Sequence, residues 1–366
     1  MKIVFFYLSQ QGGGAALDTF ELAVGLSKRA EVLCVVSSES VSYKVWKEEA
    51  LINKNFHIIG VKTTKNMLKG LLSIFNYFKF WNIIKSINNF NPDVIYSHMS
   101  HPWEKIIIPR LKSKQVFKGV HDVRLHQGES SFKARVIRAI TTYQSSYYVV
   151  FSRYSREQLI KQGINSDSIV ETSLGCCKML STNATLDETY HGKFLFFGRL
   201  IKYKGIDVLF DSLDSVFEEL PDIKLVIAGR GDISEYEEII NKHKNNLDIY
   251  NRWIEDDEVC NYYKDIDFVI APYIDASQSG VVLLSYAYGK PVIVSNSGGL
   301  PEQVVDGKTG IIIPKADSKA LSEAIIRLFK NKECLLRMKK DAFYFSNEMS
   351  WDAAANKLYN GICKLI

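Results

Sequence analysis

The sequence predicts an α/β protein made of two doubly wound domains, each with a parallel sheet. Apolar segments with strand and helix periodicity alternate in both halves of the chain. The length of 366 residues exceeds one typical core and fits two domains of roughly 150–200 residues. Residues 181–192 are polar and lack periodicity, which is typical of a linker. We therefore expect one domain over residues 1–180 and another over residues 181–350.

Composition places the chain among soluble globular proteins, with 46% hydrophobic and 24% charged residues. The six cysteines show no paired metal spacing, which favours a reducing, cytoplasmic setting. The run 1–8 ends at Ser9 without a small-residue cleavage site, so we expect a first buried strand rather than a signal peptide. No stretch reaches the ~18–20 apolar residues of a membrane span.

The N-terminal domain opens with a strand over 2–8, a glycine loop and a helix over 15–27. Three consecutive glycines let the backbone approach a ligand closely, and we include them in the candidate donor site: Gly12, Gly13 and Gly14. Their spacing differs from the dinucleotide fingerprint, and no acidic residue stands convincingly after the strand 32–36. An NAD site is therefore not expected.

The segment 65–85 is apolar around most of a helix, with a narrow polar side formed by Lys65, Lys69, Asn76 and Lys79. It fits either a helix lying on a membrane surface or a core helix with a solvated stripe. Basic residues continue on the helices expected further along, namely Lys133, Arg135, Arg138, Arg153 and Arg156. They suit a solvated face or anionic headgroups. No nucleic-acid motif accompanies them, so no nucleic-acid partner is expected.

Four histidines follow two expected strands, 92–98 and 112–122: His98, His101, His121 and His126. The carboxyl ends of parallel strands line the ligand crevice, where an imidazole can hydrogen-bond a hydroxyl or phosphate. His121, followed by Asp122, is the strongest candidate. A metal site is less favoured, because no matching carboxylate or cysteine spacing is present.

The second half alternates strands and helices from the first strand to the strand that ends at Ser295. The expected elements are strands 193–197, 224–228, 247–250 and 268–271, with helices 206–219, about 235–243 and 257–263. The small polar run 276–280 then leads into a further helix. Unpaired N–H groups at such a helix start suit a phosphate, although the same pattern occurs in ordinary strand-loop-helix units.

Several motifs in the second half occur in a defined order: Phe197–Leu209, which contains Arg199 and Lys204, then 228–232, 276–280, 297–302 and 306–310. This set resembles glycosyltransferase family 4, and the resemblance extends to the glycine loop and to His121-Asp122. It implies a GT-B fold with two Rossmann-like domains facing across a cleft. It also implies a donor held by the second domain, an acceptor held by the first, and retention of anomeric configuration. A last helix, about 351–366, would cross back to the first domain.

The resemblance also implies roles for individual residues. Arg199 and Lys204 would neutralise charge on the departing diphosphate, and His121 would approach the transferred sugar. The implied donor-binding set in the second domain is Gly198, Arg230, Trp253, Ile254, Ser277, Ser279, Gly280, Val281 and Ser285. Enzymes of this type usually need no metal, and the Asp265-Ile-Asp267 pattern leads directly into a strand and looks structural. No cofactor is therefore expected beyond the nucleotide-sugar co-substrate.

The sequence departs from the family at Ser277 and Ser285, where two glutamates usually stand. It is similar here to a branch of the family that assembles bacterial surface polysaccharides such as lipopolysaccharide O-antigen. We therefore expect a glycosyltransferase moving sugar from a nucleotide-sugar, with uridine diphosphate as the best guess, to a lipid-linked or polysaccharide acceptor. We expect it in the cytoplasm, with a peripheral position on the inner face of the membrane as the alternative. The missing glutamates leave open a catalytically silent partner-binding subunit, and a nucleotide-sugar epimerase is a third alternative.

Overall fold

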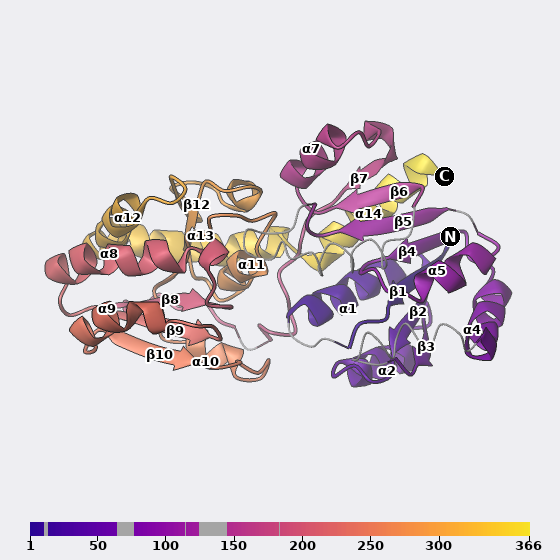
Figure 1. Cartoon of the computed structure of the whole chain (residues 1–366), viewed down its shortest axis with the longest axis horizontal. Helices are drawn as coiled ribbons and strands as arrows, with labels where there is room; N and C mark the ends of the chain where they lie inside the picture. Colours follow the sequence, from indigo (N-terminus) through magenta and orange to yellow (C-terminus); the bar gives the residue numbers. More distant parts are fainter. Residues whose placement is uncertain (11–13, 64–76, 114, 124–144, 183) are drawn as a thin grey trace. The chain divides into compact units, whose positions relative to one another are not determined.

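The computed structural model describes the chain except for residues 11–13, 64–76, 114, 124–144 and 183. The described chain forms two compact units (Figure 1). The N-terminal unit contains the described residues of three ranges, namely 1–123, 145–174 and Trp351–Ile366. The C-terminal unit contains Gly175–Ser350.

The N-terminal unit is built on a parallel seven-stranded sheet in the order β3-β2-β1-β4-β5-β6-β7. Its strands are β1 (Lys2–Tyr7), β2 (Glu31–Ser37), β3 (Phe56–Val61), β4 (Val94–Ser97), β5 (Val116–Val120), β6 (Tyr147–Val150) and β7 (Ile169–Glu171). Its described helices are α1 (Gly14–Ser27), α2 (Tyr43–Ile52), α4 (Tyr77–Phe90), α5 (Glu104–Ile107), α7 (Arg153–Lys161) and α14 (Trp351–Leu365), with short 3-10 turns η2 (Ile108–Arg110) and η3 (Ser166–Ser168).

Both faces of this sheet are covered, as the continuous apolar strands require. On one face, Val4 and Ile95 pack with Phe80 and Ile84 of α4 and with Trp103 in a single buried cluster. On the other face, α1 packs closely against α14. A methyl group placed on Gly25 would lie 2.7 Å from the Cβ of Ala355, so only glycine permits this approach. The α1–α14 contact thus ties a helix near residue 350 to the first helix of the chain.

The C-terminal unit has a parallel six-stranded sheet in the order β10-β9-β8-β11-β12-β13. Its strands are β8 (Lys193–Phe197), β9 (Lys224–Gly229), β10 (Leu247–Asn251), β11 (Phe268–Ala271), β12 (Val292–Ser295) and β13 (Gly310–Ile313). Its helices are α8 (Ile206–Glu219), α9 (Glu237–Lys242), α10 (Val259–Tyr263), α11 (Gly280–Ala287), α12 (Ser318–Lys330) and α13 (Lys332–Glu348), with the turns η4 (Lys202–Lys204), η5 (Ser234–Tyr236) and η6 (Leu300–Gln303).

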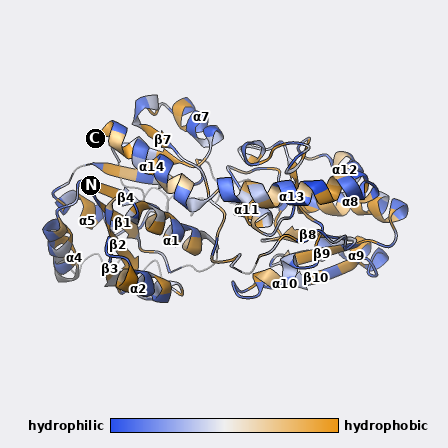
Figure 2. Cartoon of the chain, turned by 180° about the vertical axis from the view of Figure 1, so that it is seen from behind, coloured by the Kyte–Doolittle hydropathy of each residue, from blue (hydrophilic) through white to orange (hydrophobic). Residues whose placement is uncertain are grey.

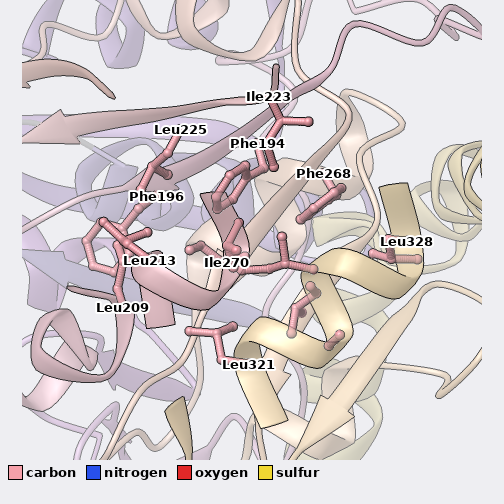
Figure 3. Packing of buried hydrophobic residues seen from close by; sticks show 14 of the residues in the cluster. Phe194, Phe196, Leu209, Leu213, Ile223, Leu225, Phe268, Ile270, Leu321 and Leu328 are labelled. Atoms are coloured by element: carbon pink, nitrogen blue, oxygen red, sulfur yellow. The ribbon is translucent and has the colours of Figure 1, made fainter. Parts of the chain in front are cut away.

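The core of the C-terminal unit lies between its sheet and the helices α8 and α12. Figure 3 shows Leu209 and Leu213 of α8 and Leu321 of α12 gathered around Phe194 and Ile270 of the strands. All five side chains are buried. In Figure 2 hydrophobic residues concentrate along the strands, while the surrounding helices carry hydrophilic residues as well. This pattern is the amphipathic helix periodicity expected from the sequence.

The segment 181–192, whose composition is typical of a linker, belongs to the C-terminal unit. Asp187 accepts hydrogen bonds from the Nε2 of His191 at 2.7 Å and from the Nζ of the buried Lys290 at 3.0 Å. The hydroxyl of Tyr288 donates to the carbonyl of Leu180. These contacts give a polar, aperiodic segment a fixed place against the domain, and the boundary between the units falls at residues 174 and 175.

The expected α/β fold class with two parallel sheets is confirmed. The segment 65–85 lies partly outside the described residues, including Lys65, Lys69 and Asn76, and its described part is α4. Ile83, Ile84 and Ile87 of α4 are buried in the sheet-facing cluster, so this side of the helix packs on the core. Lys133, Arg135 and Arg138 also lie outside the described residues.

Candidate active site

Lys204 stands on a turn that is anchored to the segment following β11. The turn η4 ends at Gly205, which has φ 75°, and a Cβ there would lie 1.9 Å from the carbonyl oxygen of Pro272. Only glycine fits this left-handed position so close to another backbone. The carbonyl of Tyr203 accepts the N–H of Ile274 at 2.7 Å. Backbone contacts therefore hold the turn that carries Lys204 beside residues 272–274.

The side chain of Lys204 points to the loop that precedes α11. Its Nζ donates to the hydroxyl oxygen of Tyr273 at 2.9 Å and lies 4.1 Å from the centroid of the same ring. The Oγ of Ser279 is 3.4 Å from the same hydroxyl. Tyr273 and Ser279 are both buried, which fixes their positions. Lys204 and Ser279, 75 positions apart in the sequence, are thus linked through Tyr273.

Gly198 lies next to both the ammonium of Lys204 and the side chain of Val281. A methyl group on Gly198 would lie 3.8 Å from the Nζ of Lys204 and 3.9 Å from the Cγ2 of Val281. Gly280 and Val281 form the first turn of α11, where a helix has no intrahelical acceptor for its N–H groups. An ammonium group and a helix N-terminus therefore meet beside Gly198. This pairing of a cation with free N–H groups is suited to a phosphate.

The loop before α11 is held by Gln303, a residue that sequence reasoning missed. Its Oε1 accepts the N–H of Ser279 at 2.7 Å, and its Nε2 donates to the carbonyl of Ser279 at 3.1 Å. The hydroxyl of Tyr286 in turn donates to the carbonyl of Gln303 at 3.0 Å. We expected the N–H groups near Ser279 and Gly280 to face a diphosphate. In this conformation the N–H of Ser279 already has a partner in the Oε1 of Gln303.

The two serines at the positions of the missing glutamates are both buried. Ser285 has no exposed surface, and its Oγ donates to the carbonyl of Val281 at 2.7 Å within α11. This hydroxyl bonds back to its own helix, so the donor contact implied for Ser285 is not prepared in this conformation. Ser277 is 7% exposed. Between the two lies Gln278, whose Oε1 is buried without a hydrogen-bond partner in the described chain.

The other expected donor contacts lie on exposed loops of the C-terminal unit. Arg199 is exposed and donates to the hydroxyl of Tyr203, with its guanidinium carbon 5.5 Å from that ring. Arg230 is exposed just after β9. Trp253 is 53% exposed after β10, while the neighbouring Ile254 is buried. An exposed indole next to an apolar side chain offers a flat surface for an aromatic ring.

In the N-terminal unit, His98 and His121 form a pair at the carboxyl ends of the neighbouring strands β4 and β5. Their Nε2 atoms are 3.0 Å apart. Burial lowers the pKa of both rings, and the charge of Asp122 opposes this for His121. His101 packs instead against Trp103, and burial lowers the pKa of His101 to about 4. His126, Gly12 and Gly13 lie outside the described residues, whereas Gly14 begins α1.

Asp267 of the Asp-x-Asp pattern has a structural role. It is fully buried, its carboxylate accepts the N–H groups of His191 and Lys193 at 3.1 Å, and Lys339 lies 2.8 Å away. Asp265 is exposed. Within the residues that the structure describes, no group of three or more histidines, cysteines and acids is placed to hold a metal ion.

Comparison with known proteins gives these sites a context. Residues 191–331 match the family model for glycosyl transferases group 1. The chain is 25% identical over 307 residues to the uncharacterized glycosyltransferase MJ1178 of Methanocaldococcus jannaschii, covering 82% of each chain. It is 32% identical over 177 residues to the phosphatidyl-myo-inositol mannosyltransferase of Mycobacterium leprae, covering 47% of this chain and 44% of that protein.

Solved structures share the whole fold. Anabaena Alr3699/HepE in complex with UDP superposes with a TM-score of 0.71 at 16% identity over 100% of both chains. A glycosyltransferase from Rickettsia africae gives a TM-score of 0.72 at 19% identity over 100% of this chain and 98% of that one. The expected GT-B fold of two Rossmann-like domains is therefore confirmed.

The fold and the matched domain together define a glycosyltransferase. That domain contains the segments that carry Lys204, Tyr273, Ser279 and Gln303. None of the helices in the described part of the chain combines the length and apolar character needed to span a membrane.

Proposed function

We propose that the protein is a retaining, family 4 glycosyltransferase that moves a sugar from a nucleotide-sugar to a lipid-linked or polysaccharide acceptor during cell-surface glycan synthesis. The observation that carries the proposal is the meeting of Lys204, Tyr273 and the N-terminus of α11 within the glycosyltransferase group 1 domain. UDP is the favoured nucleotide, because Anabaena Alr3699/HepE was solved with UDP and with UDP-glucose. No metal or further cofactor is invoked.

Lys204 and α11 would act on the diphosphate as it departs. Negative charge grows on the leaving oxygens as the glycosidic bond breaks, and a fixed ammonium group stabilises that charge more than it stabilises the bound donor. The N–H groups of Gly280 and Val281 would add hydrogen bonds to the same oxygens. The hydrogen bond to Tyr273 holds the ammonium in place beforehand, which lowers the cost of ordering it.

The remaining expected residues complete the donor and acceptor roles. Arg199 would add a second positive charge, and Arg230, Trp253 and Ile254 would contact the nucleoside. Gly12, Gly13 and Gly14 would contribute to donor binding, and His121 would approach the transferred sugar. Each of these roles is part of the proposal.

A membrane-associated acceptor is proposed for the N-terminal unit. The M. leprae relative is a phosphatidyl-myo-inositol mannosyltransferase. In this chain Trp81 is 56% exposed on α4, and the exposed Lys85 follows one helical turn later. An aromatic ring beside a cation suits the headgroup region of an anionic bilayer on the cytoplasmic side. Co-sedimentation with anionic vesicles tests this, and the Trp81→Ser, Lys85→Ser variant should be retained less.

The decisive measurement is UDP release from a panel of nucleotide-sugars with lipid-linked acceptors. Two lysines on the same turn provide a matched comparison. Lys202 is exposed and pairs with Glu235 at 3.1 Å, whereas Lys204 contacts Tyr273. Lys204→Met should lower turnover by about 10²–10³-fold. Lys202→Met should stay close to the wild type. Equal loss in both variants, or none in either, would contradict the assignment of Lys204.

The stereochemistry and the metal requirement have their own measurements. NMR of the product formed from an α-linked donor should show an α-linkage, and a β-linkage would exclude retention. Turnover should also continue at an unchanged rate after treatment with a chelator, because charge on the diphosphate is met by Lys204 and α11. Loss of activity that is restored by a divalent cation would contradict this part of the proposal.

One observation favours a catalytically silent binding subunit as the second candidate. Ser285 is buried and bonded to its own helix, so one polar contact to the nucleotide is missing. Transfer by the purified chain alone, with donor and acceptor supplied, excludes the silent subunit. Incubation with donor alone separates a transferase from an epimerase, because only the epimerase would convert the donor sugar without an acceptor.

A further inference from the structure

A chain of three hydrogen-bonding side chains lies at the carboxyl ends of β4 and β5. The hydroxyl of Tyr96 is 2.9 Å from the Nδ1 of His98, and the Nε2 of His98 is 3.0 Å from the Nε2 of His121. Tyr96 has no exposed surface and His98 is 1% exposed, whereas His121 is partly exposed. The chain therefore runs from a buried tyrosine to a histidine that a ligand can reach.

The direction of these hydrogen bonds follows from the chemistry of the groups. Burial raises the pKa of Tyr96, so its hydroxyl keeps its proton, and a buried hydroxyl needs an acceptor for that proton. Its hydrogen-bond partner in the described chain is the Nδ1 of His98, so the hydroxyl donates to this nitrogen. Burial and the neighbouring His121 lower the pKa of His98, so this ring is neutral and carries its single proton on Nε2. That proton can only be donated to the Nε2 of His121, which must then be an acceptor. A neutral His121 consequently carries its proton on Nδ1.

The packing around the chain allows little freedom. A Cβ on Gly119 would lie 2.8 Å from the carbonyl oxygen of His98 and 3.2 Å from the hydroxyl of Tyr96, so β5 approaches them only with glycine there. The ring of His98 lies against Phe5 at 5.9 Å between centroids. The ring of His121 stacks on Phe151 at 4.5 Å and 17°. Both imidazole planes are thereby held, and a 180° flip of the His121 ring, which puts Cε1 in the place of Nε2, would break its bond to His98.

We propose that Tyr96 and His98 are positioning residues that fix His121 as the neutral tautomer with its proton on Nδ1, so that this N–H is the donor offered to a substrate hydroxyl or carbonyl oxygen. The proposal deepens the proposed function, since it takes His121 as a residue that acts on the reacting sugar or acceptor. Asp122 is the charged group whose field at His121 opposes the neutral form, and burial outweighs it. The buried end of the chain also keeps His121 from turning its acceptor nitrogen toward the ligand.

Nitrogen-15 NMR of the histidine-labelled full-length protein at neutral pH tests the tautomer without requiring turnover. Two-bond correlations between ring protons and nitrogens distinguish a proton on Nδ1 from one on Nε2, and the variants His98→Gln and His121→Gln assign the signals. We expect His98 with its proton on Nε2 and His121 with its proton on Nδ1. An Nε2 proton on His121, or a doubly protonated ring, would overturn the proposal.

Three variants separate positioning from mere packing. Tyr96→Phe removes the first donor and should give mixed tautomers on both rings, with kcat reduced by roughly 10-fold. His98→Gln keeps an N–H near the Nε2 position and should retain the His121 tautomer, whereas His98→Leu should lose it. Tyr147→Phe is the control, since it removes a partly buried hydrogen bond from a tyrosine hydroxyl to the carbonyl of Leu365 in the same unit and leaves the two imidazoles unchanged.

The outcomes remain distinct from those of the proposed function. If Tyr96→Phe leaves the His121 tautomer unchanged while the fold is retained by circular dichroism, the positioning role is wrong even if the enzyme transfers sugar. If the tautomers respond as expected but His121→Gln turns over normally, the hydrogen-bond chain exists and the catalytic role of His121 is wrong. The Lys204 comparison does not depend on either result.

Discussion

The side-chain amide of Gln303 hydrogen-bonds both backbone groups of Ser279, at 2.7 Å to its N–H and 3.1 Å to its carbonyl. Ser279 directly precedes α11. The position of the helix start therefore depends on Gln303, which stands 24 positions after Ser279 in the chain. The contact is buried, and an amide is the side chain that can both donate and accept in this arrangement. Gln303 therefore shapes the candidate donor site without reaching into it.

Replacing Gln303 should weaken donor binding. Gln303→Leu leaves the N–H and carbonyl of Ser279 without partners, at a cost of about 1–3 kcal/mol each if the loop does not rearrange. We expect the loop to rearrange instead, raising KM for the donor about 10-fold. Gln303→Glu keeps the acceptor and loses the donor, and should fall in between. Steady-state kinetics with a melting curve for each variant checks this, and a KM equal to that of the wild type in Gln303→Leu would contradict it.

Tyr273→Phe should lower kcat more than it affects donor binding. The ammonium of Lys204 keeps its charge but loses the hydroxyl that holds it at 2.9 Å, so the stabilisation of the leaving group is less well ordered. We expect kcat to fall about 10-fold. The control is Tyr203→Phe, which removes the hydroxyl that contacts Arg199 on the same turn. A similar decrease in both variants would mean that the turn, and not the position of Lys204, matters.

Lys339 and Asp267 form an ion pair with no exposed surface on either side chain. Lys339→Met leaves the carboxylate with only its backbone donors in a buried place, which should destabilise the protein by about 3–5 kcal/mol. Asp267→Ala should destabilise the protein by a similar amount, because the ammonium of Lys339 is then buried without its carboxylate partner. The exposed Asp265 is the control, and Asp265→Ala should change stability by less than about 0.5 kcal/mol. Chemical denaturation monitors all three, and a destabilised Asp265→Ala variant would contradict the assignment.

Glu104 should make the N-terminal unit less stable as the pH rises. It is buried, the Oγ of Ser97 donates to its Oε2 at 2.8 Å, and its Oε1 has no partner in the described chain. Burial raises the pKa of Glu104 to about 8, against an ordinary value of 4.5. The folded chain therefore keeps a proton that the unfolded chain releases. The contribution of Glu104 to the free energy of unfolding is complete below its pKa in the unfolded chain. It is lost as the pH rises through its pKa in the folded chain.

Glu104→Gln should remove this pH dependence, because an amide does not titrate. We expect the variant to gain stability relative to the wild type between pH 5 and 8.5, by about 1–3 kcal/mol at the upper end. Thermal melts across this range measure the difference. A constant difference between the two proteins at every pH would show that Glu104 does not titrate in this window.

Much of the fold could be predicted from the sequence, because buried parallel strands are continuous apolar runs. The strands β8 and β11 were expected with the bounds that the structure has, and β1 within one residue. The helix expected at about 235–243 is divided into η5 and α9, since its residues are mostly exposed and little packing holds it regular. Short elements such as β7, with three residues, carry too little pattern to be recognised.

The candidate site was predictable where a motif residue acts through its own side chain. Lys204 and His121 were named from the sequence, and the structure gives each a specific partner. Tyr273 and Gln303 were missed, although Tyr273 follows a strand end and Gln303 adjoins the expected motif 297–302. Their roles depend on which loop each side chain reaches, and that is set by tertiary packing. The inward hydrogen bond of Ser285 could not be read from spacing for the same reason.

The placement of α14 has a consequence for the order in which the protein is assembled. Its residues pack on α1, where Arg29 pairs with Asp352 at 2.9 Å and Trp351 donates to Asp18 at 3.1 Å. Between these two helices in the chain lies the entire C-terminal unit. As the ribosome synthesises the protein, the unit that starts first is thus completed last. Until then the face of α1 around Gly25 stays open to solvent, which makes the nascent N-terminal unit the part most in need of protection from aggregation.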